Sequence, residues 1–221
     1  MGTIVRGAVT ILVFFAILFI PAGRLDWWEG WTFFLVFLIA TSTLVIWMRQ
    51  KDPELISERS QPGENVEQWD RIIMSIYTIL LIIMLIVAGI DSGRLDLSSP
   101  PLFLRIAGWC GLIISMLTVA WAMSSNTFLS EMVRIQDDRG HVVVTQGPYR
   151  YIRHPMYVGV ILAIISTPLV LGSFWALIPA GLIVIVFVVR TCLEDRTLQE
   201  KLPGYTEYAA QVRYRLIPGI W

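Results

Sequence analysis

Long stretches without a charged residue dominate this 221-residue sequence. Uncharged runs cover residues 7–23, 30–48, 72–90 and 106–130, and each is close to the roughly 20 residues with which one helix crosses a bilayer. A fifth run, residues 155–189, is 35 residues long. As one straight helix it would measure about 52 Å at about 1.5 Å per residue, which far exceeds a hydrocarbon core of roughly 30 Å. This run is therefore expected to fold back on itself.

Helix-breaking residues near the middle of the longest run indicate where it turns. Pro168, the Gly172-Ser173 pair and Pro179 disfavour one continuous helix. We expect a tight helical hairpin whose arms cover about residues 156–171 and 174–192. Together with the four shorter runs, this hairpin gives six membrane-spanning helices.

The distribution of basic residues favours six spans over five. Six spans place 14 of the 17 lysines and arginines on the side that holds both termini, whereas five spans divide them 9 against 8. Because basic residues are enriched in cytoplasmic loops, both termini are expected in the cytoplasm. Trp27, Trp28 and Trp31 are then expected at the opposite membrane interface, where aromatic residues gather.

The composition agrees with a chain that lies in lipid. Hydrophobic residues make up 56% of the sequence and charged residues only 15%, against about 25% charged residues in soluble domains. We expect an all-α, multi-pass integral membrane protein that forms a single domain over residues 1–221. Its first half, residues 1–100, supplies N-terminal transmembrane helices.

Several classes of site are excluded by residue counts and spacing. The 17 basic and 17 acidic residues cancel, so no basic field for nucleic acid is expected. The two histidines and the two cysteines, Cys110 and Cys192, lack metal-ligand spacing, so we expect no metal site and no disulfide framework. No two glycines stand in Gly-x-Gly spacing, which excludes a Rossmann fingerprint and the glycine-rich loop of soluble methyltransferases.

Polar chemistry is concentrated in two stretches, residues 125–155 and 190–221, one at each end of the expected hairpin. Both ends of a hairpin lie on the same side of a membrane, so Arg153-His154 and Arg190 are expected to come close to Glu194. Ionisable groups at this depth are costly unless they face a polar cavity. A simpler interpretation also stays open, in which Arg190 and Glu194 form an i,i+4 surface ion pair beside an interfacial loop.

Two other polar segments carry weaker signals. Residues 49–71 contain many charges and Pro53, and we interpret them as a solvated loop with a short amphipathic piece. Tyr205, Tyr208 and Val212 have helical spacing, which predicts a short helix on the membrane surface that is a candidate cover for the site.

An ordered set of short motifs covers about residues 121–218. The motifs are Gly140-His141, Gly147-Pro148-Tyr149, Arg153-His154-Pro155-x-Tyr157-x-Gly159, the acidic pair Glu194-Asp195, Leu202-Pro203-Gly204-Tyr205-x-x-Tyr208, and Arg215-Leu216-Ile217-Pro218. As a set, with the hairpin between them, they resemble the isoprenylcysteine carboxyl methyltransferase (ICMT) family, which belongs to a larger group with the phospholipid N-methyltransferases. One departure is Asp195, because the acidic pair of the family is usually two glutamates.

The resemblance implies a membrane enzyme that takes a methyl group from S-adenosyl-L-methionine, releases S-adenosyl-L-homocysteine, and acts on a lipophilic or prenylated substrate from the bilayer. It places the cofactor on the cytoplasmic side. The cofactor contacts that it implies are His141, Val143, Gly147, Tyr149, Arg153, His154, Tyr157 and Glu194.

Arg190 and Glu194 are the expected catalytic residues. A carboxylate nucleophile needs only a cation to orient it, and Arg190 is suited to that role. Glu194 would hold either the ammonium of the cofactor or Arg190 itself. An amine nucleophile would instead need proton removal, for which Glu194 or His154 is suited. The sequence does not choose between O-, N- and S-methylation.

Other functions remain open beside isoprenylcysteine-type carboxylate O-methylation. They are a phospholipid or amine N-methyltransferase, an NADPH-dependent sterol-type reductase that binds its dinucleotide in the same hairpin region, and a non-catalytic membrane scaffold or transporter. Against transport, the expected spans carry no charged residue except Arg190 near the end of the second hairpin arm. The sequence decides neither the methyl acceptor nor the oligomeric state.

Overall fold

The computed structural model describes residues 3–60 and 65–221, and these residues form an all-helical protein without a strand. The expected all-α class is confirmed. The helices are α1 (Thr3–Ala22), α2 (Trp28–Lys51), α3 (Pro53–Ser60), α4 (Gln68–Ala88), the π-helix η1 (Gly89–Leu95), α5 (Leu102–Ser125), the short 3₁₀ helices η2 (Asp137–Arg139) and η3 (Gly147–Arg150), α6 (Pro155–Leu171), α7 (Leu177–Lys201) and α8 (Tyr205–Gln211).

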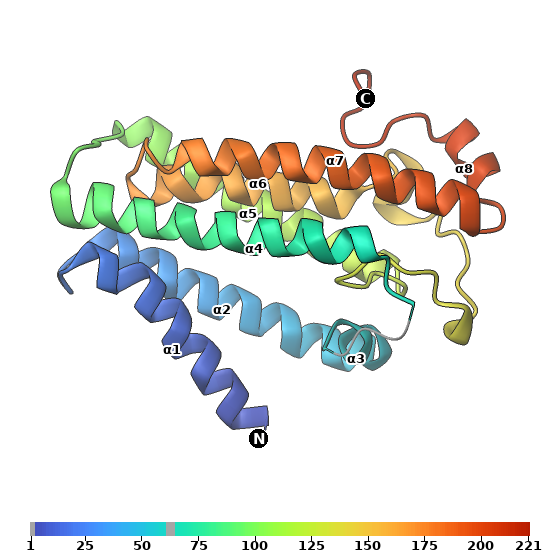
Figure 1. Cartoon of the computed structure of the whole chain (residues 1–221), viewed down its shortest axis with the longest axis horizontal. Coiled ribbons are helices and arrows are strands. Elements are labelled where there is room, and N and C mark those ends of the chain that lie inside the picture. Colours follow the sequence, from blue (N-terminus) through green and yellow to red (C-terminus); the bar gives the residue numbers. More distant parts are fainter. Residues whose placement is uncertain (1–2, 61–64) are drawn as a thin grey trace.

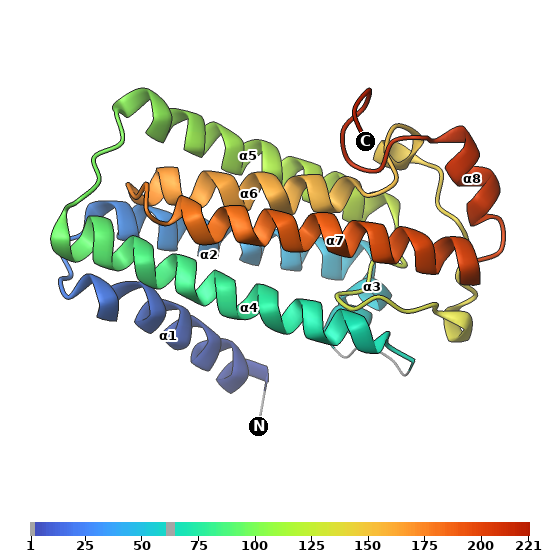
Figure 2. The ribbon, with the colours of Figure 1, turned by 45° about the horizontal axis from the view of Figure 1, so that its top comes forward.

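The long helices run side by side as an elongated bundle (Figure 1). The same arrangement is seen from a second direction, with α3, α8 and the segment between α5 and α6 gathered at one end (Figure 2). The turn between α6 and α7 and the end of η1 lie at the opposite end. Polar segments are therefore collected at one end of an apolar bundle.

Four helices are long and apolar enough to cross a membrane: α2, α4 with η1, α5 and α7. Two further helices are apolar but shorter, α1 over Gly7–Ala22 and α6 over Pro155–Leu171. Many large hydrophobic side chains point outward from the bundle, as expected of helices that face lipid. The protein is therefore an integral membrane protein.

The longest uncharged run forms two helices, α6 and α7. The break falls at Gly172, whose φ of 80° is left-handed and suits glycine, whereas Pro168 lies inside α6. The second arm begins at Leu177 and continues to Lys201, beyond the expected range of 174–192. The turn is tied to η1, because Ser173 Oγ donates a hydrogen bond to the buried Asp91 Oδ2 at 2.5 Å.

Trp27 is a correction to the expected aromatic belt. Its side chain is fully buried, and its Nε1 donates a hydrogen bond to Ser92 Oγ at 3.2 Å. It belongs to the main core cluster, which also contains Leu18 and Ala88. Trp28, by contrast, is 74% exposed and is free to lie at a membrane interface. One indole of the three is therefore a core residue, because it points inward between α1 and η1.

Small residues bring α5 and α6 close together. A Cβ added at Gly159 would lie 2.7 Å from Val119 Cγ2 and 3.1 Å from the carbonyl oxygen of Ser115. Ser115 Oγ donates a hydrogen bond to the Gly159 carbonyl at 2.7 Å. Close approach through glycine and serine is a common way to pack helices in lipid. It fixes α6, whose first turn carries the polar residues described below.

Substituting Gly159 tests this packing. We expect Gly159→Ala to lower the free energy of unfolding by about 1–3 kcal/mol through overpacking. The matched control is Gly181→Ala, since a Cβ at Gly181 in α7 meets nothing within 4 Å. Thermal unfolding in detergent should show a lower midpoint for Gly159→Ala only. Equal midpoints for the two variants would contradict the proposed contact.

Candidate functional site

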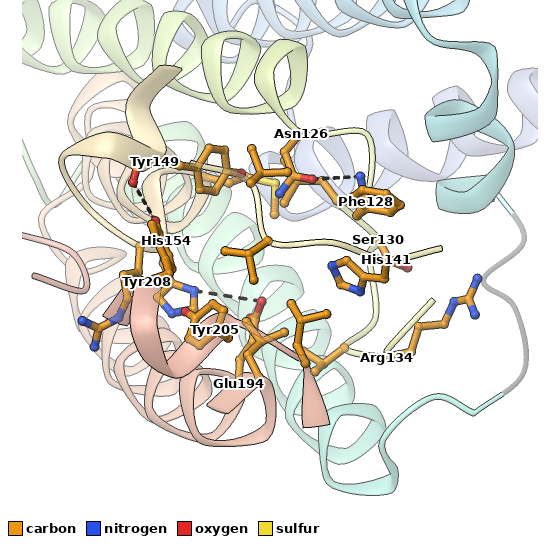
Figure 3. A pocket seen from close by; sticks show the side chains of 18 of the residues that line it. Asn126, Phe128, Ser130, Arg134, His141, Tyr149, His154, Glu194, Tyr205 and Tyr208 are labelled. Atoms are coloured by element: carbon orange, nitrogen blue, oxygen red, sulfur yellow. Dashed lines mark hydrogen bonds and ion pairs between the residues drawn. The ribbon is translucent and has the colours of Figure 1, made fainter. Parts of the chain in front are cut away.

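A polar pocket lies at the end of the bundle where α7, α8 and the segment between α5 and α6 meet (Figure 3). All predicted site residues except Gly147 line it. The lining residues used below are Asn126, Leu129, His141, Val143, Tyr149, Arg153, His154, Met156, Tyr157, Arg190, Glu194, Leu198, Tyr205 and Tyr208. The structure therefore brings together residues that are up to 82 positions apart in the sequence.

Gly147 is the one predicted site residue that is not among those lining the pocket. Its φ is 57°, and a Cβ there would clash with Ser125 Oγ at the end of α5. The glycine therefore allows the left-handed turn before η3 and the close approach of that turn to α5. Gly147 therefore holds the start of η3 against the end of α5, next to the pocket.

Asp195 is the centre of a buried polar cluster. This carboxylate is fully buried, and its Oδ1 accepts hydrogen bonds from Arg153 Nε at 2.7 Å and from the Tyr205 hydroxyl at 3.0 Å. Its Oδ2 accepts from Arg153 Nη2 at 3.0 Å and from Arg215 Nε at 2.9 Å. A buried carboxylate is tolerated when donors surround it in this way. The acidic residue whose role the sequence left open thus joins α6, α7 and the C-terminal segment.

Arg153 is committed to the same cluster. Besides Asp195, its guanidinium contacts the C-terminal segment, because Nη1 donates to the carbonyl oxygens of Val212 at 2.7 Å and Arg213 at 2.9 Å. The Arg153 backbone N–H also donates to the Tyr214 carbonyl at 3.0 Å. The side chain lines the pocket, but these contacts make it a residue that positions the C-terminal segment.

Glu194 faces the pocket from the neighbouring position on α7. Its side chain is 20% exposed, and its Oε2 accepts a hydrogen bond from the Tyr157 hydroxyl. His154 Nδ1 lies 4.0 Å from Glu194 Oε1, and the His154 ring stacks on Tyr157 with 5.6 Å between ring centroids. Glu194 and Asp195 therefore have different surroundings, one open to the pocket and one closed by donors.

Arg190 does not pair with Glu194, contrary to the i,i+4 expectation. It forms a two-pronged ion pair with Asp70 of α4, with Nε–Oδ1 at 2.8 Å and Nη2–Oδ2 at 2.9 Å. Its Nη2 also donates to the Glu131 carbonyl oxygen at 2.7 Å. The guanidinium lies 5.2 Å from the centre of the Tyr157 ring. Arg190 is therefore already paired with a fully buried carboxylate, and its expected catalytic role stays a prediction.

The 49–71 segment is more than a solvated loop, which corrects a second expectation. Asp70 is fully buried, and its Oδ2 also accepts a hydrogen bond from the Val133 backbone N–H at 2.7 Å. Glu58 on α3 is buried and binds Arg134 through Nε at 2.7 Å and Nη2 at 2.8 Å. These two carboxylates hold the pocket-lining segment 128–134 in place. Sequence reasoning missed both residues.

A signal for Asp70 is present in the sequence. Asp70 lies two residues before the uncharged run 72–90, and Arg190 directly follows the run 155–189. In the six-span arrangement both residues lie at the same side of the membrane. An acid and a base at such depth stabilise each other by pairing, since either alone would be an uncompensated charge.

Tyr149 contributes an unpaired hydroxyl to the pocket. Its side chain is buried, and its hydroxyl oxygen makes no hydrogen bond of ordinary geometry within the described residues, where Asn126 is the polar side chain beside it. Burial raises the pKa of this phenol. The Tyr149 carbonyl is held by the Tyr208 hydroxyl at 2.6 Å, which fixes the backbone (Figure 3). A buried polar group without a partner is costly, and it marks a position where a ligand would supply the missing bond.

His141 is kept neutral at physiological pH. Burial lowers the pKa of its imidazole from 6.5 to about 4. The ring stacks on Phe128 with centroids 4.7 Å apart, and Nδ1 lies 3.4 Å from the Gln136 backbone nitrogen. The neutral ring therefore offers the pocket a hydrogen-bonding group without a charge.

The comparison with known families agrees with this geometry. Residues 107–200 match the isoprenylcysteine carboxyl methyltransferase (ICMT) family. No curated protein matches the sequence. The matched region runs from α5 through α7 and so contains most of the pocket wall, whereas α1–α4 and α8 lie outside it.

Removing the Asp70 charge tests the buried ion pair. Asp70→Asn leaves Arg190 buried without its carboxylate, and we expect a loss of about 3–5 kcal/mol in the free energy of unfolding. The control is Glu200→Gln, which breaks the exposed Arg196–Glu200 pair on α7, the helix of Arg190. This variant should have no measurable effect on stability. Thermal unfolding in detergent distinguishes them. Similar midpoints for both variants would show that burial of the pair has little effect on stability.

The lowered pKa of His141 predicts an acid sensitivity. The folded pKa lies below the unfolded value, so between pH 6.5 and about 4 the unfolded chain binds a proton that the folded protein does not. This contribution destabilises the protein progressively as the pH falls through that window. We expect His141→Gln to lose less of its thermal midpoint between pH 7.5 and pH 5 than the wild type. An equal loss in both proteins would contradict a partly buried neutral imidazole.

Proposed function

Because residues 107–200 match the isoprenylcysteine carboxyl methyltransferase family, we propose that this chain is an S-adenosyl-L-methionine-dependent methyltransferase that acts on a lipophilic acceptor in the membrane. Isoprenylcysteine-type carboxylate O-methylation is the leading reaction. The observation that carries the proposal is the convergence of the family motifs on one pocket that contains an unpaired Tyr149 hydroxyl and the open Glu194 carboxylate.

The residues of the pocket fit S-adenosyl-L-methionine in chemical character. Glu194 supplies a carboxylate for an ammonium, and Tyr149 supplies a hydroxyl that lacks a partner. Val143 and Leu198 supply apolar surface for a purine ring, beside the neutral His141. The bound cofactor supplies a methyl group on a sulfonium, whose in-line transfer to a nucleophile leaves a thioether.

The protein contributes alignment and exclusion of water to this reaction. A carboxylate acceptor needs no proton removed, so no strong base is required. Tyr157, Tyr205 and Tyr208 are buried around the pocket, where they exclude water from the reacting groups. The Asp195 cluster holds the C-terminal segment against α7, which keeps the tyrosines of α8 in position.

A second, apolar cavity supports a lipophilic acceptor. It has a volume of about 300 Å³ and lies within the bundle, lined by side chains of α1, α2, α4, α5 and α6. Val160 of α6 lines this cavity one helical turn after Tyr157, which lines the polar pocket. An acceptor with its chain in the apolar cavity would therefore have its polar end close to the cofactor pocket.

The membrane arrangement that we propose has six spans, namely α1, α2, α4 with η1, α5, α6 and α7. Both termini and the pocket are placed on the cytoplasmic side. The support is the excess of basic residues on that side and the gathering of α3, α8 and the pocket segments at one end of the bundle. We propose that residues 1–100 and the motif region, residues 121–218, form one domain.

Calorimetric titration of the detergent-purified protein tests the cofactor. We expect S-adenosyl-L-methionine and S-adenosyl-L-homocysteine to bind, and NADPH not to bind. Tyr149→Phe should weaken binding by roughly twofold to tenfold and Glu194→Gln by about tenfold to a hundredfold, as for neutral and charged hydrogen bonds. Glu207→Gln, an exposed acid on α8, is the control and should bind as the wild type does.

Two outcomes would refute the proposal. Folded protein that binds neither S-adenosyl compound is not a methyltransferase of this kind, and selective binding of NADPH would favour the reductase alternative. Full affinity in both Tyr149→Phe and Glu194→Gln would instead refute the assignment of the pocket, since the cofactor would then bind elsewhere.

A further inference from the structure

The buried arginines around the polar pocket are already neutralised. Arg134, Arg153 and Arg190 are each at most 6% exposed at the side chain, and each makes a contact of 2.7–2.8 Å with a carboxylate. Such pairing makes a buried cation tolerable, but it also cancels most of its field. An anionic ligand would gain little from these three residues.

Arg59 on α3 has a different environment. Its side chain is 23% exposed, and Nη2 lies 3.6 Å from Oε1 of Glu131, whose own side chain is 53% exposed. Nη1 lies 3.4 Å from the Leu129 carbonyl oxygen and 3.9 Å from Met156 Sδ. These distances exceed the roughly 2.7–2.9 Å of a charge-assisted hydrogen bond. Among its described contacts, Arg59 is therefore a partly buried cation with a loosely held carboxylate.

Arg59 lies directly behind the wall of the polar pocket, although its side chain lines neither that pocket nor the apolar cavity. Leu129 and Met156, which it contacts, both line the polar pocket. Met156 lies in the first turn of α6, and Val160 one turn further on lines the apolar cavity. Helix α3 is fixed there by the fully buried Leu55, which belongs to a small core cluster with residues of α2 and α5.

We propose that Arg59 is the specificity-determining residue that binds the anionic group of the acceptor, a carboxylate at the end of an apolar chain. The chain would lie in the apolar cavity and the carboxylate would displace Glu131, whose exposed side chain can move into water. The planar guanidinium suits a carboxylate because it offers two parallel donors. This inference rests on the proposed function and assigns to Arg59 the role that the sequence suggested for Arg190.

Binding of a matched pair of probes tests the proposal. The probes are N-acetylated S-farnesylcysteine and its carboxamide, which differ in one negative charge, titrated calorimetrically into the full-length protein in detergent. We expect the wild type to prefer the carboxylate. Arg59→Gln should weaken carboxylate binding about tenfold to a hundredfold, as for loss of a hydrogen bond to a charged group, and leave carboxamide binding unchanged. Arg59→Lys should have a carboxylate affinity between those of the wild type and Arg59→Gln, since lysine keeps the charge but lacks the two parallel donors of a guanidinium.

Two further variants sharpen the test. Glu131→Gln removes the competing carboxylate and should strengthen carboxylate binding by up to about fivefold, the usual range for an exposed pair. Arg49→Gln, an exposed arginine near the end of α2, is the control and should leave both affinities unchanged. Unchanged carboxamide and S-adenosyl-L-methionine affinities in Arg59→Gln show that the variant is folded.

Three results would overturn the role of Arg59. They are equal affinity of the wild type for the two probes, a carboxylate preference that survives in Arg59→Gln, and binding of neither probe. Dioleoyl phosphatidylglycerol, added as a competitor, separates an acceptor carboxylate from a lipid phosphate. Displacement that depends on Arg59 would assign the residue to lipid phosphate and overturn the proposal. Titration with S-adenosyl-L-methionine decides the proposed function independently of all these results.

Discussion

The ion pair between Arg190 and Asp70 connects the two halves of the protein. Arg190 belongs to the region that matches the methyltransferase family, whereas Asp70 lies on α4, outside it. The same carboxylate holds the backbone of Val133 in the pocket wall. Since neither charge is stable alone at this depth, the motif region depends on a residue of the N-terminal helices. Helices that carry no recognisable motif are thus part of the pocket's construction.

Three charged side chains of helix α7 point in three different directions. Arg190 points toward α4, Glu194 into the pocket, and Asp195 toward Arg153 and the C-terminal segment. Glu194 and Asp195 are neighbours on a helix, so their side chains leave it about 100° apart. One helix therefore binds both the N-terminal half and the C-terminal segment, while the Glu194 carboxylate faces the pocket. The shorter Asp195 side chain is adequate because Arg153, Arg215 and Tyr205 all come to it.

The all-helical class and the approximate bounds of the long helices were the parts of this protein that sequence reasoning predicted best. Uncharged runs reveal helices because lipid excludes charge, and a helical hairpin must bring Arg153-His154 and Glu194 to one side. The tertiary contacts of individual side chains were less predictable. Asp70 and Arg190 are 120 positions apart, and Trp27 looks like its interfacial neighbours until the packing of α1 against η1 is known. The partner of each buried charge, and whether an indole faces the core or the lipid, depend on the tertiary arrangement. Residue type and local spacing do not determine them.

Charge neutrality also bears on how substrate and product would be distinguished. Three buried arginines have their own carboxylates, whereas the loosely paired Arg59 contacts two residues of the pocket wall, Leu129 and Met156. Under the proposed function, methylation converts the acceptor carboxylate into a neutral ester. The ester loses its attraction to Arg59 while it keeps its affinity for lipid. The reaction itself would then release the product into the bilayer, without any movement of the helices being required for discrimination.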